Sequence, residues 1–451
     1  MIENKPFYLL VVFWGEQHRR LFLDLALSSL LADQNIPALN NSVRKNRLLI
    51  ATTKEDWDAL KGDPIFRKAE RVITPEFIEL LYQNDADNKM LKMSAGHKAL
   101  TDRAFRDDAW GVHLCPDVIY SNGSMKSVRV QAELGAHVVL TAAVRFEYEG
   151  VIATLKSRGL EGMCPLSLSG REAVDIALKH PHGEFKAASW DSPFFWEFPV
   201  YTSWTVPGEN GVVQHTYSWS PILLDYAALT DHSDDIFDKW TLDGDYVYQN
   251  FPELTSELHV VTDSDEVFLL PVTPAAEACP PQDPHWSKRL PGFRTWTRAH
   301  FINMVHNHDV MDPLKRRIFF KPVRWHAEPI NRNWEAVEAR VRHFLLKYIQ
   351  SEEADQERRK DMLIENPAMT DEQATYNARI RHRIIGARLT LGWIMRMLPV
   401  WMVYALYYGP KYGLSLSRDY LRVIGLALSG DRTEWERIQK RIRWLIARAG
   451  L

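Results

Sequence analysis

The chain has 451 residues and a mass of 52.2 kDa, which predicts roughly two to four domains. Its hydrophobic share of 46% and charged share of 25% exclude a disordered or fibrous protein, and a net charge of −3 gives the whole molecule no affinity for nucleic acid. Its cysteines exclude a disulfide framework and favour a reducing compartment, since they are odd in number and widely spaced: Cys115, Cys164 and Cys279.

The first 144 residues alternate short apolar runs with helical patterns. We expect strands at residues 7–13, 48–52, 71–73, 112–115 and 138–144. We expect helices at residues 21–31, from residue 54, and at 88–106. This alternation predicts βαβ units, and therefore an α/β fold with a Rossmann-type, mostly parallel sheet flanked by helices. The first apolar run has about eight residues and no cleavage site after it, so it indicates a buried strand and not a signal peptide.

Ligands of such sheets bind outside the carboxyl ends of the strands. Residues that directly follow predicted strands are therefore the first candidates for a binding site. Trp14 and Gly15 follow the first strand, and Asp117 follows the strand at 112–115. A glycine at this point lets a nucleotide approach the backbone closely, although it is equally common in ordinary turns.

The rest of the chain is organised differently. Residues 150–274 are rich in aromatic side chains and have a looser pattern, and a turn-rich segment follows at 279–284. Residues 333–361 are strongly helical, and a polar break at 366–371 separates them from a second helical region. We therefore predict a catalytic domain at 1–280, a linker and helical segment at 281–365, and a basic helical region at 366–451.

Residues 92–124 form a helix, a strand, an aspartate and a polar turn, in that order. With this order the sequence resembles glycosyltransferases of the GT-A type, over roughly residues 7–275. The resemblance implies a GT-A-like fold and the transfer of a sugar from a nucleotide-diphospho-sugar to a glycan or lipid-linked acceptor. It also implies that Asp117 helps to hold a divalent cation, Mg²⁺ or Mn²⁺, on the diphosphate. The family usually has an Asp-x-Asp motif there, whereas this chain has one acid, in Pro116-Asp117-Val118.

The same resemblance implies nucleotide-sugar contacts from Trp14, Gly15, His97, Asn122 and Ser124. Each has a purely structural alternative. His97 can be a partly exposed histidine on a helix, and Asp117 can cap the turn formed by residues 121–123.

A second group of candidates lies in the later half of the chain. Asp243 and Asp245 flank a glycine, and His215 precedes them. Two carboxylates can act as the base for an acceptor hydroxyl or bind a cation, so we predict catalytic roles for Asp117, Asp243 and Asp245. We predict a metal site formed by Asp117, Asp245 and His215. The alternative is a solvated turn, because Asp-Gly is a common turn dipeptide.

The C-terminal region has its own charge. Residues 379–451 contain fourteen Lys and Arg against four Asp and Glu, a net charge of +10. The apolar stretch that begins at Met397 is about a dozen residues long, too short to span a bilayer. Flanking arginines and aromatic residues predict amphipathic helices on an anionic membrane surface. Packing on the catalytic domain or on a second copy of the chain is the alternative. The predicted location is cytoplasmic, peripheral at the inner face of the membrane.

Three functions follow from these patterns. The first is a sugar transferase that uses a nucleotide-activated donor. The second is a non-catalytic binding or scaffold protein that keeps the fold without the full acid pair. The third is a nucleotidyltransferase, which usually has a glycine-rich signature near the first strand that this chain lacks.

Overall fold

A computed structural model describes residues 5–39, 46–80, 88–142, 144–190, 200–252, 256–277 and 308–365. The chain divides into two compact units. The first comprises Met1–Gln282 and Asn303–Phe344, and the second comprises Asp283–Ile302 and Leu345–Leu451. The basic region at 366–451, its predicted amphipathic helices and Cys279 lie outside the described residues. The predicted domain boundaries stay predictions.

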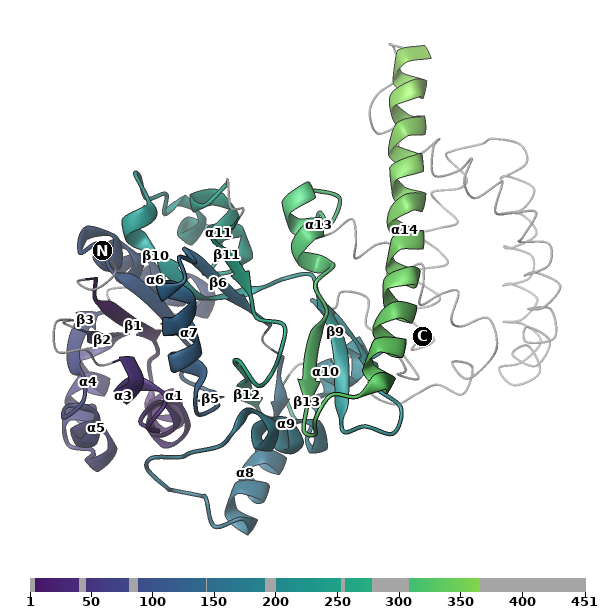
Figure 1. The fold of residues 1–451 in the computed structure, drawn as a ribbon. Helices are drawn as coiled ribbons and strands as arrows, with labels where there is room; N and C mark the ends of the chain where they lie inside the picture. Colours follow the sequence, from purple (N-terminus) through teal and green to yellow (C-terminus); the bar gives the residue numbers. More distant parts are fainter. Residues whose placement is uncertain are drawn as a thin grey trace, which may run out of the picture. The chain divides into compact units, whose positions relative to one another are not determined.

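Figure 1 shows the fold and labels most of its elements. The strands are β1 (Phe7–Val12), β2 (Arg47–Thr52), β3 (Thr74–Glu79), β4 (Trp110–Leu114), β5 (Val118–Tyr120), β6 (Val138–Thr141), β7 (Phe146–Glu147), β8 (Tyr201–Thr205), β9 (Gly211–Thr216), β10 (Ser220–Asp225), β11 (Leu258–Val260), β12 (Leu269–Thr273) and β13 (Val323–His326). The helices are α1 (Glu16–Leu21), continued by a π-helical stretch (Phe22–Leu27) and α2 (Ser28–Leu30), then α3 (Ile36–Leu39), α4 (Lys54–Lys61), α5 (Pro64–Ala69), α6 (Lys89–Arg106), α7 (Ser124–Glu133), α8 (Tyr148–Ser157), α9 (Gly170–Lys179), α10 (Gly183–Ala188), α11 (Gly244–Asn250), α13 (Pro313–Phe319) and α14 (Arg332–Glu365). Short 3₁₀ turns lie at Tyr226–Ala228 and Asp235–Asp238.

A seven-stranded sheet forms the centre of the first unit. Its order is β11-β6-β10-β4-β1-β2-β3, and every neighbouring pair is parallel except the two that involve β10. The predicted α/β fold with a mostly parallel sheet is therefore confirmed. The chain adds β2 and β3 on one side of β1 and then places β4 on the other side. Because the strand order reverses here, the carboxyl ends of β1 and β4 form the topological switch point, where ligands of such sheets bind.

Both faces of this sheet are buried, as the continuous apolar runs predict. Side chains of β1 alternate between two cores: Tyr8, Leu10 and Val12 belong to one, and Phe7 and Leu9 to the other. Helices α6 and α11 contribute to the first core, and the helix at 16–30, α5 and α7 to the second. Packing of α6 is especially close, because a Cβ on its residue 96, a glycine, would lie 2.5 Å from Cγ1 of Val12.

The third strand was predicted at the wrong residues. Residues 71–73 form the turn after α5, and the strand is β3, at Thr74–Glu79. The predicted strand ended at residue 73, before Pro75, and proline cannot donate a hydrogen bond to a neighbouring strand. However, β3 is at the edge of the sheet and pairs only with β2 among the described strands. Proline is tolerated at such an edge.

Two small sheets complete the first unit. One has the order β5-β12-β7 and begins directly after Asp117, and the other has the order β13-β9-β8. The second small sheet brings β13 alongside β9, although more than one hundred residues separate them.

Candidate functional site

The carboxyl ends of β1 and β4 lie side by side at the switch point, since Val11 pairs with Leu114. Gly15 follows the end of β1 by three residues, and Asp117 follows the end of β4 by three. We call the residues directly after these two strands, Trp14, Gly15, Cys115 and Asp117, the sheet rim. The structure therefore brings together at one edge three residues that the sequence singled out as candidates.

The backbone around Asp117 is tightly held. The N–H of Cys115 donates to the Tyr120 hydroxyl at 2.9 Å, and the N–H of Tyr120 donates to Oγ of Ser29 at 3.0 Å. The N–H of Val272 donates to the carbonyl oxygen of Asp117 at 2.9 Å. These bonds fix the position from which the Asp117 side chain leaves the backbone, as a preorganised site requires.

The Asp117 carboxyl group is half-buried. Burial raises its pKa, and its own backbone N–H and the charges of His18 and Arg145 offset only part of that rise. No side chain of the described residues donates a hydrogen bond to this carboxylate. A carboxyl group with a raised pKa at the carboxyl edge of a parallel sheet is a candidate for acid–base or ligand-binding chemistry.

Cys115 lies two residues before Asp117. Desolvation, reinforced by the charge of Asp117, raises the pKa of this thiol to about 12. The thiol is therefore protonated at neutral pH, whereas only the thiolate is a good nucleophile. Of the two side chains, Asp117 is therefore the stronger candidate for a role in chemistry, and that role stays a prediction.

Gly15 has a backbone conformation that favours glycine, with φ of +82°. A Cβ added here would meet no atom within 4 Å, so the space beside it is open. Its N–H donates to Oδ2 of Asp56 at 2.6 Å, and Arg19 pairs with the same carboxylate at 2.6 Å. Trp14 is half-buried, and Nζ of Lys92 lies 4.9 Å from the centre of its ring. Nucleotide contacts by Trp14 and Gly15 stay predictions.

His97 connects α6 to the later half of the chain. Its Nδ1 lies 2.8 Å from Oγ1 of Thr241. Burial lowers the pKa of His97 to about 4, so the ring is neutral at pH 7. The predicted contact with a nucleotide sugar is untested, but the bond to Thr241 places His97 close to the segment that contains Asp243.

Asn122 and Ser124 hold the turn after β5. Oδ1 of Asn122 accepts from the N–H of Gln34 at 3.0 Å, and its Nδ2 donates to Oγ of Ser167 at 3.1 Å. Ser124 is fully buried, and its hydroxyl lies 2.9 Å from that of Ser121. These contacts are structural, and a role of either residue in ligand binding stays a prediction.

A pocket of about 100 Å³ surrounds the second predicted group of acids. Its lining includes Tyr217, Trp219, Asp243, Asp245, Tyr248 and Lys315. Asp243 caps α11 by accepting from the N–H of Asp245 at 2.9 Å, and it also accepts from Nε1 of Trp240 at 2.7 Å. Burial raises the pKa of Asp243. Asp245 is exposed and pairs with Nζ of Lys315 at 3.3 Å. The pair at 243 and 245 is therefore part of a concave site.

The direction of β10 places this pocket at the same edge of the sheet as Asp117. β10 runs antiparallel to its neighbours β4 and β6. Its first residue, Ser220, pairs with Thr141, which is the last residue of β6. Trp219, which lines the pocket, directly precedes Ser220. The pocket therefore begins at the carboxyl edge of the parallel strands, on the β10 side of β4.

His215 lies elsewhere, in β9 of the second small sheet. It is 2% exposed, and its Nδ1 lies 2.8 Å from the carbonyl oxygen of Phe319. Burial lowers its pKa to about 4. In the described part of the chain, the group of three or more side chains with metal-binding geometry does not contain Asp117, Asp245 or His215. The predicted three-residue metal site is thus not assembled there, and each ligand role on its own stays a prediction.

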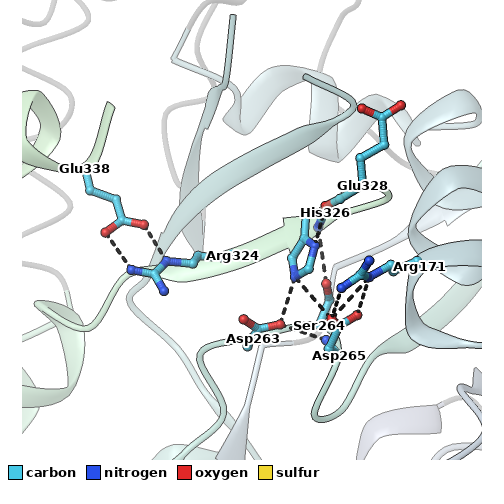
Figure 2. Close-up of polar contacts among 8 residues, drawn as sticks. All are labelled: Arg171, Asp263, Ser264, Asp265, Arg324, His326, Glu328 and Glu338. Atoms are coloured by element: carbon cyan, nitrogen blue, oxygen red, sulfur yellow. Dashed lines mark hydrogen bonds and ion pairs between the residues drawn. The ribbon is translucent and has the colours of Figure 1, made fainter. Parts of the chain in front are cut away.

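Asp263, Asp265 and His326 do form such a group, which we call the acid–histidine cluster (Figure 2). Their candidate ligand atoms all lie within 4.8 Å of one another, so the geometry is compatible with a divalent cation. Nδ1 of His326 lies 2.7 Å from the carbonyl oxygen of Glu328, which leaves Nε2 to face the acids. Two carboxylates and an imidazole are ligands that suit Mn²⁺ or Zn²⁺.

The charges of this cluster are already compensated by the protein. Nε2 of His326 lies 2.9 Å from Oδ1 of Asp263 and 3.9 Å from Oδ2 of Asp265. Arg171 binds both carboxylate oxygens of Asp265, with a shortest distance of 2.7 Å. Burial lowers the pKa of His326, but the hydrogen bond and charge of Asp263 outweigh this effect and the pKa is raised. A cation would have to replace these ion pairs.

Sequence analysis missed this cluster. Asp263-Ser264-Asp265 is an Asp-x-Asp motif shortly after β11 (Leu258–Val260), a signal that could have been used. The partners Arg171 and His326 lie about ninety and sixty residues away, and no local pattern connects them. The pocket residues Trp219 and Lys315 were missed for the same reason.

Comparisons with known proteins give only local similarity. No family model matches the sequence, and no curated protein matches it. Among solved structures, the apo form of mouse xyloside xylosyltransferase 1 is 10% identical, with 35% of this chain and 61% of that chain covered. Two structures of S. aureus TarS are each 9% identical, and each match covers 39% of this chain. The match covers 56% of the structure of TarS residues 1–349 and 34% of the other TarS structure. The chain thus spans less than two thirds of each of these proteins. All three TM-scores are 0.22, so these likenesses carry no argument about function.

No described helix combines the length and the apolar character that a membrane crossing needs.

Proposed function

We propose that this chain transfers a sugar from a nucleotide-diphospho-sugar to a glycan or lipid-linked acceptor. The observation that carries this proposal is the position of Asp117, directly after β4 at the switch point of a mostly parallel sheet. Dinucleotides and nucleotides bind at this point of doubly wound sheets. The raised pKa of Asp117 and the nearby charges of His18 and Arg145 support a site for an anionic donor.

Breaking the bond between the sugar and the diphosphate places negative charge on the leaving group, which fixed positive groups must stabilise. Arg145 is a cationic side chain whose charge acts on Asp117, and His18 interacts with the same carboxyl group. In this proposal both side chains face the diphosphate. A divalent cation, when bound, would supply further charge stabilisation. Asp117 would hold it together with the donor phosphates, because Mg²⁺ is commonly bound by one or two carboxylates and substrate phosphates. Mn²⁺ accepts the same oxygen ligands.

The acceptor hydroxyl must lose a proton as it attacks the sugar. In this proposal a carboxylate of the pocket accepts that proton. Asp243 is the better candidate, because two hydrogen bonds fix it and burial raises its pKa. Asp245 is exposed and is paired with Lys315, so its role in this proposal is to position that lysine at the pocket.

The rival function is a binding or scaffold protein without transferase activity. The observation that favours it is the single acid at the rim, since no group of three or more metal-binding side chains among the described residues contains Asp117. A nucleotidyltransferase would differ by releasing pyrophosphate. Location at the inner face of a membrane, through the basic region at 366–451, is part of the proposal for the lipid-linked acceptor and concerns residues that are not described.

The first experiment measures thermal stability and donor hydrolysis with UDP-, GDP-, CDP- and TDP-sugars, each with and without Mn²⁺. We expect at least one donor to raise the melting temperature and to be hydrolysed slowly to the nucleoside diphosphate. Stabilisation without hydrolysis or transfer would favour the scaffold, and pyrophosphate release would favour the nucleotidyltransferase. If none of the donors binds, the proposed function is wrong.

A further inference from the structure

The pocket at Asp243 has rigid aromatic walls. The ring of Tyr217 is stacked on that of His308, with centres 5.3 Å apart, and on that of Phe319, with centres 5.0 Å apart. Nζ of Lys315 lies 4.9 Å from the centre of the Tyr248 ring. These contacts hold the rings in place, so the pocket has rigid aromatic side chains beside its polar groups. Such walls suit a ligand that has both C–H faces and hydroxyl groups.

A buried hydrogen-bond donor adjoins this pocket and has no protein partner. Trp219 is 2% exposed, and its indole N–H makes no hydrogen bond within the described structure. Buried polar groups are nearly always hydrogen-bonded, and leaving one unpaired is unfavourable. Because Trp219 lines the pocket, an oxygen atom of a bound ligand can supply the missing acceptor.

The charges around the pocket restrict the ligand further. Three carboxylates line it, those of Asp243, Asp245 and Asp309, against one ammonium group, that of Lys315. Lys315 is already paired with Asp245. Carboxylates accept hydrogen bonds from hydroxyl groups but repel phosphates and other carboxylates. A neutral ligand rich in hydroxyl groups therefore fits, and an anionic ligand does not.

We propose that this pocket binds one ring of a neutral saccharide and rejects sugars that carry a carboxylate or phosphate. Its volume of about 100 Å³ limits the occupant to a small unit. That the bound ring is the acceptor rests on the proposed function. The position of the pocket supports this step, because it begins at the start of β10, at the edge of the sheet where Asp117 lies.

The test measures binding to the full-length protein by saturation-transfer NMR. The neutral probes are the methyl glycosides of glucose, galactose, mannose and N-acetylglucosamine, and the anionic probes are glucuronate and glucose 6-phosphate. We expect at least one neutral glycoside to bind, and the anionic probes to bind at least about tenfold more weakly. Trp219→Phe removes the N–H and keeps an aromatic ring, so it should weaken binding about tenfold, as the loss of one hydrogen bond predicts.

Trp110→Phe is the matched control. Trp110 is also 2% exposed and also has an unpartnered indole N–H, but it lies at the start of β4 and does not line the pocket. This variant should leave saccharide binding unchanged. Asp309→Asn removes one carboxylate at a residue with φ of +52°, a conformation that asparagine tolerates. It should strengthen the binding of glucuronate relative to the neutral glycosides.

Three results would overturn the inference: no neutral glycoside binds, the anionic probes bind equally well, or both tryptophan variants weaken binding to the same extent. The proposed function is tested separately by the sugar nucleotides. If these still bind when no glycoside does, only the pocket inference is wrong. If a glycoside binds as expected and no sugar nucleotide does, the saccharide pocket stands and the transferase proposal is wrong.

Discussion

The sheet rim and the acid–histidine cluster both contain aspartates that follow a strand of the same sheet, yet their electrostatics differ. Asp117 at the rim is half-buried, has a raised pKa, and receives no side-chain hydrogen bond within the part of the chain that is described. In the cluster, Asp263 is paired with His326 and Asp265 with Arg171. The acid at the rim is therefore only partly compensated by its surroundings, whereas the charges of the cluster are compensated by ion pairs within it.

This difference predicts different roles for the two regions. A carboxylate with its charge satisfied by fixed neighbours contributes to structure, here by connecting α9, the segment after β11, and β13. A carboxylate that is held by its backbone and left without partners retains its capacity to bind a ligand. An acid pair in the sequence is thus a weaker indication of chemistry than the surroundings of each acid.

The strongest test of the comparison is Asp117→Asn. If Asp117 acts on the donor, this isosteric change should lower the rate of transfer or donor hydrolysis by about 10²–10⁴-fold without changing the urea midpoint of unfolding. Asp238→Asn is the control, since Asp238 is exposed and lies 3.9 Å from its partner Lys98. Equal activity of both variants would remove the rim from the mechanism.

Gly170→Ala should disrupt the cluster through the backbone. An added Cβ would lie 2.2 Å from the carbonyl oxygen of Ser264, between the two cluster aspartates. Such overpacking destabilises by about 1–3 kcal/mol, which urea unfolding can measure. Gly62→Ala is the control, because the closest atom to its added Cβ is 3.7 Å away. We expect the Gly170→Ala protein to keep its affinity for sugar nucleotides. Loss of that affinity at full stability would show that the two regions are coupled.

The pH dependence of the free energy of unfolding tests the burial of two histidines, His97 and His113. Burial lowers the pKa of His97 to about 4 and that of His113 to about 3, the latter with a smaller contribution from His97. Both rings are neutral when folded and gain protons below about pH 6.5 when unfolded. Their contribution to the free energy of unfolding is therefore complete above pH 6.5. It is lost as the pH falls, by up to about 1.4 kcal/mol per pH unit for each ring.

Urea midpoints measured between pH 7 and pH 5 test this sign. His113→Gln should flatten the acid side of the profile, although it lowers stability at pH 7 because the bond from Nε2 to the Tyr226 hydroxyl, 3.1 Å long, is lost. An unchanged slope would mean that His113 is accessible to protons in the folded protein.

The smallest expected effect is that of Asp263→Asn. The Asp263 side chain is 35% exposed, so solvent screens its pair with His326 and the loss should be about 1 kcal/mol. Melting temperatures with and without Mn²⁺ give the second measurement. If the cation is held at Asp117 with the donor, stabilisation by Mn²⁺ and donor persists in this variant. If it is lost, the cluster is the metal site.

The sequence predicted the features that depend on local pattern. Strands β1, β2, β4 and β6 are buried on both faces, so each forms a mostly apolar run in the sequence that a hydropathy pattern can detect. β3 was predicted too early, at 71–73, and its position at an edge, where Pro75 is tolerated, became evident only from the sheet. The position of Asp117 at the sheet edge could be predicted because residues after parallel strands share one edge, whereas its role stays a prediction.

Contacts between distant residues could not be predicted in this way. His326 meets Asp263 only because β13 pairs with β9 in a separate small sheet. Lys315 meets Asp245 across seventy residues of chain. His215 has a residue type suited to metal binding, but its burial against Phe319 follows from tertiary packing. Spacing along the chain carries no information about such partners.

The reversed strand β10 has a consequence for how this protein can diversify. At the carboxyl edge of the parallel strands, each parallel strand ends and the residues that follow it lie there. β10 runs the other way, so the residues that precede it, Tyr217 and Trp219, lie at this edge. The edge is thus supplied by two segments that share no loop. If the chain is the proposed transferase, substitutions before β10 would change which acceptor binds and leave the residues after β1 and β4 unchanged, so the choice of acceptor could evolve independently of donor binding.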